Sequence, residues 1–254
     1  MIKNKVIILI SMIVFALSSI AAATMSKFVL IIPLYNEINE NRTNEYITCL
    51  MKNLAHKSIE QVHVIYDTSK DSEKNRIFTY LKNNANIRIT FSNKRPSYEY
   101  CFQLANSFYP GKKIILSNAD MFFNDTLALL ENYDFTNTFF ALTRWNCLND
   151  GSLEIFKQYN AQGKFIKTDS ESSQDVWIFK TPIKHINCDD ICLGLMACDS
   201  VIAYRAQKSG LIVKNPCLTI QCCHLHLTEK KDYTKQPRPY KGQPIAFVPW
   251  EKLS

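Results

Sequence analysis

Asn118 and Asp120 combine an amide and a carboxylate at a spacing that suits cation binding. They follow the apolar run 113–117 and are separated by one residue, so an extended turn would point both side chains the same way. Carboxylate and amide oxygens are ligands for hard cations such as Mn²⁺ and Mg²⁺. A structural role is the alternative, because Asn and Asp commonly cap the helix that follows a strand.

His224 and His226 lie on a segment of alternating side chains and share one face with Cys222. Cysteine and histidine are zinc ligands, so these three residues would suit Zn²⁺. A second interpretation is that a single histidine completes a cation site at Asp120. A third is that they are ordinary strand residues held by hydrogen bonds.

Asp175 and Asp199 are the candidate acids for proton transfer. Asp175 directly precedes the apolar segment 176–179, and Asp199 lies near the start of an expected helix. Either carboxylate would serve as a general base if it reached an acceptor hydroxyl, although helix capping alone also explains Asp199. Arg95 and Arg144 are the basic residues whose positions suit a diphosphate.

The elements that must position these residues alternate in type, which predicts an α/β domain. In the first half we expect strands over 27–33, 61–66, 87–91 and 113–117, and helices over 43–56, 72–83 and 97–108. The second half is less regular, with strands expected over 139–145, 176–179, 211–213 and 218–227 and a helix over 198–209. We therefore predict one mostly parallel central sheet flanked by helices.

Polar residues follow three of the expected strands. They are Tyr35-Asn36-Glu37, Asp67 and Asn118-Ala119-Asp120. Ligands of open α/β sheets bind beyond the carboxyl ends of the strands, so a binding site is expected where these clusters meet.

The composition excludes several ways of binding a ligand. The chain has 254 residues, a net charge of +7 and six glycines, the first of which is Gly111. No GxGxxG or GxxxxGK[ST] motif is present, so a glycine-rich phosphate loop is excluded. The basic residues are spread along the chain without a dense block, which argues against nucleic-acid binding.

Residues 1–23 have the pattern of a signal peptide or signal-anchor. Lys3 and Lys5 precede the uncharged run Val6–Ala23, which ends in small residues. The run reaches the lower length limit for a spanning helix, so both cleavage and N-terminal membrane anchoring stay open. We expect a secreted, periplasmic or secretory-lumen location, an oxidising setting in which some of the nine cysteines would pair.

A series of motifs follows in fixed order along the chain. They are Val29-Leu-Ile-Ile-Pro-Leu-Tyr-Asn-Glu37, Arg42-x-x-Glu45-Tyr46, Asp67, Arg95-x-x-Tyr98, Asn118-Ala-Asp-Met-Phe-Phe123, Leu142-Thr-Arg-Trp145, Ser173-Gln-Asp-Val-Trp-Ile-Phe179, Cys198-Asp199 and His224-x-His226. The first strand, Asp67 and the Asn118–Asp120 motif resemble those of GT-A nucleotide-sugar glycosyltransferases, and the fuller string is similar to an uncharacterised GT-A-like group. The resemblance extends over about residues 28–233.

The resemblance implies a GT-A-like fold and a role for each candidate residue. Nucleoside contacts would come from the ends of the first two strands, at Pro33, Tyr35, Asn36, Glu37 and Asp67. Asp120 matches the last acid of the metal-binding Asp-x-Asp motif, with His224 or His226 as a further ligand. Phosphate contacts would come from Arg95, Arg144 and Asn118, and Asn118 departs from the Asp of the wider superfamily.

The leading hypothesis is a glycosyltransferase, of hexosyl or related type, that uses a nucleoside-diphosphate sugar and Mn²⁺ or Mg²⁺. Asp199 is the preferred base for an inverting reaction, with Asp175 as the second candidate. The expected organisation is a leader at 1–23, a GT-A-like domain at 24–233 and a Pro/Lys-rich tail at 234–254. The alternatives are a non-catalytic glycan-binding or accessory protein of the same fold, and a secreted metal-dependent hydrolase.

Overall fold

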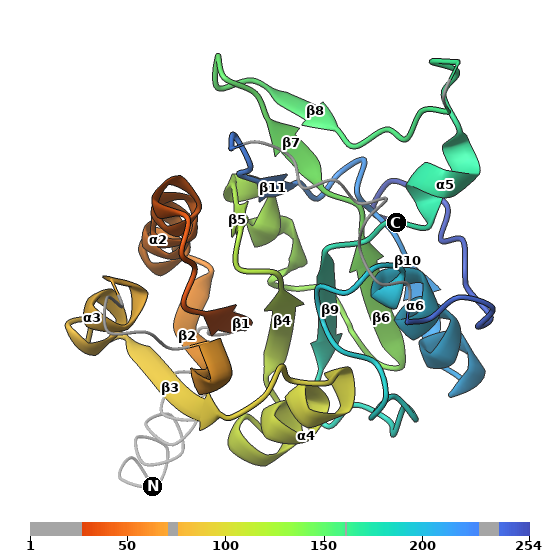
Figure 1. Cartoon of the computed structure of the whole chain (residues 1–254). Coiled ribbons are helices and arrows are strands. Elements are labelled where there is room, and N and C mark those ends of the chain that lie inside the picture. The colour runs from red at the N-terminus through yellow and green to blue at the C-terminus, as the bar shows by residue number, and fades with distance from the viewer. Residues whose placement is uncertain (1–26, 71–75, 161, 229–238) are drawn as a thin grey trace, which may run out of the picture.

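The computed structural model describes residues 27–70, 76–160, 162–228 and 239–254 (Figure 1). Seven strands form the main sheet, namely β1 (Phe28–Tyr35), β2 (Ile59–Asp67), β3 (Ile87–Ser92), β4 (Lys113–Ser117), β6 (Thr138–Leu142), β9 (Val176–Lys180) and β10 (Ile212–Lys214). Their order is β10-β6-β9-β4-β1-β2-β3. Only β9 is antiparallel to its neighbours, β4 and β6. The predicted mostly parallel α/β sheet is confirmed.

Four helices cover the two faces of this sheet, namely α2 (Glu40–Ala55), α3 (Arg76–Lys82), α4 (Tyr98–Phe108) and α6 (Cys198–Lys208). The other helical elements of the described residues are the short helix α5 (Lys167–Glu171) and the 3₁₀ turns η1 (Thr68–Lys70) and η2 (Asp125–Leu130). In β1, Leu30 and Ile32 pack into a core with α2 and α3, whereas Val29 and Ile31 pack into a second core with α4 and α6. Because successive side chains of a strand point to opposite faces, an unbroken apolar run is what a strand between two helix layers requires.

The strand order opens a crevice between β1 and β4. From β1 the chain crosses through α2 to β2 and β3 on one side, and α4 then carries it back to β4 on the other side (Figure 1). The two strands pair only as far as Ile31 and Leu116, although β1 continues to Tyr35 alongside β2. Such a switch in direction is where ligands of open α/β sheets bind, so the fold itself marks the crevice.

A second sheet of four strands lies beside this crevice. Its members are β5 (Met121–Phe123), β7 (Trp145–Cys147), β8 (Leu153–Ile155) and β11 (Cys222–His224), in the order β5-β11-β7-β8. The expectation that a strand over 218–227 completes the main sheet is wrong. Only Cys222–His224 is a strand, and it pairs with β5 and β7.

Helix α2 is fastened to this second sheet. The Asn53 amide donates to the backbone oxygen of Met121 at 2.9 Å and accepts from the backbone N–H of Phe123 at 3.3 Å. Both bonds are buried, and they satisfy backbone groups of β5 that no strand pairs on that side. One face of α2 therefore holds the start of the second sheet in place.

The helix starts follow the local signals of the sequence. Asn39 caps α2 by accepting from the Arg42 N–H at 3.1 Å, and Ser97 caps α4 in the same way. The expected helix over 72–83 is seen as α3, with 71–75 outside the described residues. Asn124 caps η2 by accepting from the Thr126 N–H at 3.2 Å.

Several expectations fall on residues that the structure does not describe. The leader at 1–23 and the boundary between domain and tail at 233–234 lie there. Residues 239–254 pack on the domain, where the N–H of Val248 donates to the Glu171 carbonyl at 2.9 Å. All nine cysteines lie in the described part and are free thiols, so the disulfides expected from the sequence are not seen. Within the described ranges, no helix has the length and apolar character needed to cross a bilayer.

Candidate active site

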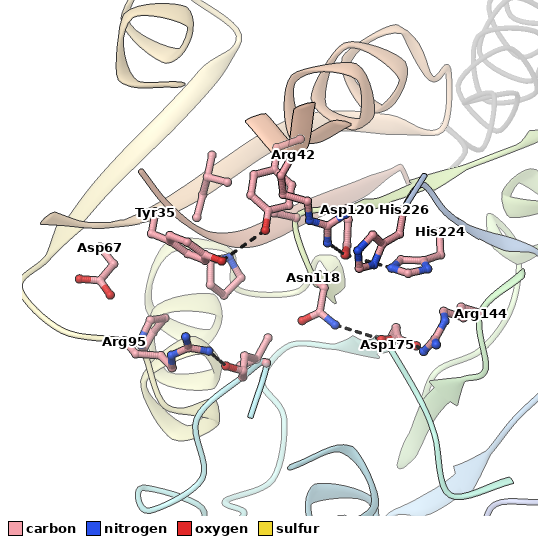
Figure 2. Close-up of a pocket in the computed structure, with 17 residues that line it drawn as sticks. Tyr35, Arg42, Asp67, Arg95, Asn118, Asp120, Arg144, Asp175, His224 and His226 are labelled. Carbon is pink, nitrogen blue, oxygen red and sulfur yellow. Dashed lines mark hydrogen bonds and ion pairs between the residues drawn. The ribbon is translucent and has the colours of Figure 1, made fainter. Parts of the chain in front are cut away.

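A pocket occupies the crevice at the carboxyl ends of β1, β2 and β4 (Figure 2). Its empty volume is about 1030 Å³, part of which is open to solvent. The lining residues are Pro33, Leu34, Tyr35, Arg42, Tyr46, Asp67, Arg95, Pro96, Asn118, Ala119, Asp120, Arg144, Asp175, Leu193, Gly194, His224 and His226. Most of the site residues expected from the sequence therefore surround one space.

Asp120, His224 and His226 form a cluster that suits a divalent cation. One ligand atom from each of the three lies within 4.8 Å of the others. The Nε2 atom of His224 lies 3.0 Å from Oδ2 of Asp120, whereas Oδ1 of Asp120 is buried without a hydrogen-bond partner. A buried carboxylate oxygen without a partner is costly, and a bound cation would satisfy it. The residues present thus fit the cation that the resemblance implies.

The charges of the cluster also suit a cation. Burial by itself would raise the pKa of Asp120, but His224 and Arg42 beside it hold that pKa well below its usual value. Burial, with Arg42 and His224 nearby, lowers the pKa of His226 to about 4. Asp120 is therefore a carboxylate and His226 a neutral imidazole at pH 7, the forms that bind metals.

Two residues of α2, Arg42 and Glu45, connect to this cluster through an ion pair between Arg42 and Asp120. The Arg42 guanidinium pairs with Oδ2 of Asp120 and, at 2.5 Å, with Oε2 of Glu45. Glu45 Oε1 accepts from the backbone N–H groups of Leu227 and Thr228 at 2.7 and 2.9 Å. One turn of α2 thus holds both the carboxylate and the segment that carries the histidines.

The opposite end of the pocket carries the expected nucleoside residues. The Tyr35 hydroxyl lies 3.3 Å from a carboxylate oxygen of Glu37 and 3.4 Å from the Tyr46 hydroxyl. Asp67, which is buried, accepts from the N–H and hydroxyl of Ser69 at 2.9 and 2.6 Å. These short-range bonds orient the side chains that end β1 and β2 toward the pocket.

Arg95 reaches the pocket floor from the loop before α4. Its Nη1 donates to the Leu193 carbonyl at 2.9 Å and lies where a Cβ atom on Gly194 would be only 3.1 Å away. Gly194 also has φ +72°, a conformation that favours glycine. A side chain at Gly194 would therefore displace the Arg95 guanidinium.

Asn118, Asp175 and Arg144 form a third group between the other two. The Asn118 amide donates to Oδ1 of Asp175 at 3.1 Å, and Arg144 Nη1 lies 2.7 Å from Oδ2. The Arg144 guanidinium also stacks on Phe156, 3.9 Å from its ring centre. Asn118 lines the same pocket as Asp120, and its amide bonds to Asp175 rather than to the Asp120 carboxylate.

Asp199 lines an adjoining cavity rather than the main pocket. This cavity has an empty volume of about 850 Å³ and shares Asn118, Arg144, Asp175 and Gly194 with the pocket. Asp199 accepts from the Gln174 N–H at 3.0 Å. Removal from water, together with the charge of Asp175, raises the pKa of Asp199 to about 7. That value suits proton transfer near neutral pH.

Besides Asp199, three expected residues do not line the pocket. Asn36 is buried behind it, and Glu37 is turned toward Tyr35 and toward the N–H of Asn39, 3.1 Å away. Cys222 is also outside the metal-ligand cluster, since its thiol contacts the Thr143 carbonyl at 3.5 Å. The zinc interpretation with Cys222 is therefore wrong, and the interpretation that combines histidine with Asp120 agrees with the geometry.

Arg42, Tyr46 and Gly194 line the pocket although they were not expected there from the sequence. Arg42 and Tyr46 belong to a motif of the resemblance, and their spacing of four residues puts both on one helix face. Gly194 carried no local signal. The contact of that helix face with Asp120 is a product of tertiary packing.

The fold is similar to that of GT-A-type glycosyltransferases. GalNAc-T7 with UDP, GalNAc and Mn²⁺ matches at TM-score 0.51 and 10% identity, over 80% of this chain and 44% of that chain. The mannosyltransferase PcManGT from Pyrobaculum calidifontis, with GDP-Man and Mn²⁺, matches at 0.52 and 14%, over 86% and 68%. S. aureus TarS 1-349 with UDP-GlcNAc matches at 0.51 and 15%, over 83% and 61%.

These likenesses show that the chain has the GT-A fold. The chain spans less than half the length of the GalNAc-T7 structure that it matches. No protein-family model matches the sequence, and no curated protein matches it in a sequence comparison.

Proposed function

We propose that this chain is a glycosyltransferase that moves a sugar from a nucleoside diphosphate to an acceptor hydroxyl. The observation that carries the proposal is the cluster of Asp120, His224 and His226 at the crevice, with one carboxylate oxygen buried and unpaired. A diphosphate needs concentrated positive charge where no glycine-rich loop is available. A divalent cation at this cluster, with Arg95 and Arg144 across the pocket, would supply it.

The nucleoside would occupy the end of the pocket nearest β1 and β2. Asp67 is a buried acceptor for ribose or base donors, and Tyr35 offers an aromatic face beside it. The three solved structures of similar fold hold UDP, GDP-Man or UDP-GlcNAc, which supports a nucleotide-sugar donor.

Mn²⁺ or Mg²⁺ would be held by Asp120, His224 and His226. When bound, the cation neutralises charge on the departing diphosphate. The chain's own contribution is to keep Asp120 ionised and His226 neutral and to place Arg144 nearby. Imidazole ligands favour Mn²⁺ over Mg²⁺, which prefers oxygen ligands alone.

Asp199 is the base that we propose for an inverting reaction. It would take the proton of the acceptor hydroxyl while that oxygen bonds to the anomeric carbon and the diphosphate leaves with the electrons of the broken bond. Asp175 is tied to Arg144 and Asn118, so its proposed role is to orient the acceptor. The acceptor would enter through the cavity that contains Asp199.

A secretory location, with or without N-terminal anchoring, is part of the proposal and rests on residues 1–23 alone. The acceptor would then be a glycan, lipid or protein of that compartment. A signal-anchor predicts that the full-length chain partitions with membranes, whereas a cleaved leader predicts a shortened chain without residues 1–23.

The deciding experiment incubates the purified full-length chain with UDP- and GDP-sugars, with and without Mn²⁺, and measures release of nucleoside diphosphate. We expect cation-dependent release and a rise in melting temperature with the matching nucleotide. Asp120→Ala should lose both, while the exposed Asp125→Ala should keep them. Absence of any shift and any release across the panel would refute catalysis, and phosphate release from simple esters would favour a hydrolase.

A further inference from the structure

Arg42 places a positive charge directly on a residue that we assign to the cation. Its guanidinium pairs with Oδ2 of Asp120 in the same cluster as His224 and His226 (Figure 2). A cation site that must hold an ion by itself gains nothing from a guanidinium beside its carboxylate, because like charges repel. Cation binding alone therefore does not explain why Arg42 pairs with Asp120.

We propose that Arg42 makes cation binding depend on the nucleoside diphosphate, so that neither is held firmly without the other. The inference rests on the proposed function, and it assigns Arg42 as the residue that couples the two ligands. Arg42 lowers the affinity of the empty site for the cation alone. It adds its own charge to that of the cation when the diphosphate enters.

The charges of the described side chains support this coupling. Asp120 is the one carboxylate of the ligand cluster, and Arg42 occupies one of its two oxygens. Glu45 offsets only part of the Arg42 charge at the cation, because Arg42 lies between it and Asp120 and its other oxygen accepts from the backbone N–H groups of Leu227 and Thr228. An arriving cation would meet a carboxylate whose Oδ2 already pairs with Arg42 and His224 and whose Oδ1 alone has no hydrogen-bond partner.

The number of ligands leads to the same conclusion. Mn²⁺ and Mg²⁺ take about six ligands, and the cluster offers three residues. Phosphate oxygens are the natural source of the others, and they bring negative charge that both Arg42 and the cation attract. By linkage, whatever factor the diphosphate adds to cation affinity, the cation adds to diphosphate affinity.

Arg42 is fixed in this position. It is 9% exposed, its Nη1 donates to the Leu225 carbonyl at 3.2 Å, and its guanidinium lies 4.8 Å from the ring centre of Tyr46. Together with the 2.5 Å contact to Glu45, these contacts prevent the side chain from swinging away when a cation binds. Its charge is a permanent part of the site.

The test measures Mn²⁺ binding to the full-length chain by the loss of the free-Mn²⁺ EPR signal, alone and with UDP or GDP. For the natural chain we expect weak binding alone and a marked gain with the preferred diphosphate. Arg42→Met should bind Mn²⁺ alone about tenfold more tightly, and the gain from the diphosphate should shrink by a similar factor. Arg42→Lys keeps the charge, so it should retain most of the natural coupling.

Two further variants serve as a control and as a replacement if Arg42→Met does not fold. Arg76→Met removes an exposed arginine of α3 that pairs at 2.5 Å with Glu40, which is on the same helix as Arg42, and it should leave Mn²⁺ binding unchanged. If Arg42→Met does not fold, Arg42→Met with Glu45→Gln removes both charges of the buried pair. That double variant should also bind Mn²⁺ alone more tightly, but by a smaller factor than Arg42→Met, because the negative charge of Glu45 is removed as well.

The outcomes separate this inference from the proposed function. If the natural chain binds neither Mn²⁺ nor a diphosphate, both are overturned. If it binds both, but Arg42→Met binds Mn²⁺ alone no more tightly and keeps the full gain, only the inference falls. The role of Arg42 is then structural, to connect α2 with the segment His224–His226.

Discussion

The two ends of the pocket are built in different ways. At the nucleoside end, Asp67 bonds to Ser69, two residues away, and Tyr35 to Glu37, also two residues away. At the cation end, the partners of Asp120 are 78 and 104 residues away in the chain. The first end is made by the strand ends themselves, whereas the second exists only when the whole domain has folded.

This difference predicts different responses to substitution. A side chain at the nucleoside end has one or two partners, the farthest of them Tyr46, eleven residues from Tyr35, so its loss should weaken few contacts. A side chain at the cation end shares charge with several partners, so its loss should change them all. The following four changes test this contrast, from the largest expected effect to the smallest.

Asp120→Ala should have the largest effect. It removes the one carboxylate of the metal-ligand cluster and leaves Arg42 and His224 without their shared partner. We expect Mn²⁺ binding to be lost and turnover to fall by about 10³-fold. Mn²⁺ titration and diphosphate release measure this, with Asp125→Ala as control. If Asp120→Ala kept near-natural turnover, the expectation that substitutions at the cation end have the larger effect would be wrong.

Asp199→Asn should lower turnover by about 10²-fold, because a general base typically contributes 10²–10⁴. With the pKa of Asp199 at about 7, turnover of the natural chain should rise as pH increases through 7, and the variant should lack this rise. A pH profile from 5.5 to 8.5 measures both. If the turnover of Asp199→Asn still rose with pH in the same way, the titrating group would be a residue other than Asp199.

The same substitution should change stability in a pH-dependent way. The pKa of Asp199 is higher in the folded chain than the unfolded value of about 3.9, so its contribution to stability is full below pH 4 and is lost by about pH 7. Between pH 4 and pH 8 the natural chain should therefore lose about 4 kcal/mol of unfolding free energy that Asp199→Asn keeps, since one pKa unit corresponds to about 1.4 kcal/mol. Urea unfolding at both pH values measures this difference.

Asp67→Ala should have a moderate and confined effect. It removes an acceptor for the nucleoside, which should weaken diphosphate binding about five- to tenfold, and Mn²⁺ binding without nucleotide should not change. Calorimetric titration of the diphosphate and EPR titration of Mn²⁺ separate the two. Loss of Mn²⁺ binding in this variant would show that the two ends are not independent.

Glu40→Gln should have the smallest effect. Glu40 pairs with Arg76 at 2.5 Å, but both side chains are mostly exposed, unlike the buried pair of Arg42 and Glu45 on the same helix. We expect a loss of about 0.5 kcal/mol or less, since exposed ion pairs contribute little. Thermal unfolding should show Glu45→Gln to be clearly more destabilised than Glu40→Gln.

The sequence predicted the parts of the fold whose signals are local. The apolar run that became β1 and the Ser97 cap of α4 lie close to where the pattern placed them. The end of β4 and the Asp120 that follows it were likewise readable, because a strand end is a local feature. For the same reason the nucleoside end of the pocket was the easier part to anticipate.

The parts that could not be predicted depend on packing between distant segments. Nothing near residue 222 indicates that β11 pairs with β5 in a second sheet, since its partner lies about a hundred residues earlier. The contact of Arg42 with Asp120 depends on which way α2 is rotated against the sheet. The turn of Asn118 toward Asp175 follows from the position of β9, an antiparallel strand inserted beside β4.

The two bonds from Asn53 to β5 have a consequence for motion. They tie the last turns of α2 to β5, and Leu225 donates from beyond β11 to the Asp120 carbonyl at 2.9 Å. We therefore expect α2, β5 and the segment that follows β11 to unfold locally as one cooperative unit. Their amide protons should exchange with solvent at a common rate, and Asn53→Ala should accelerate the exchange of all three together.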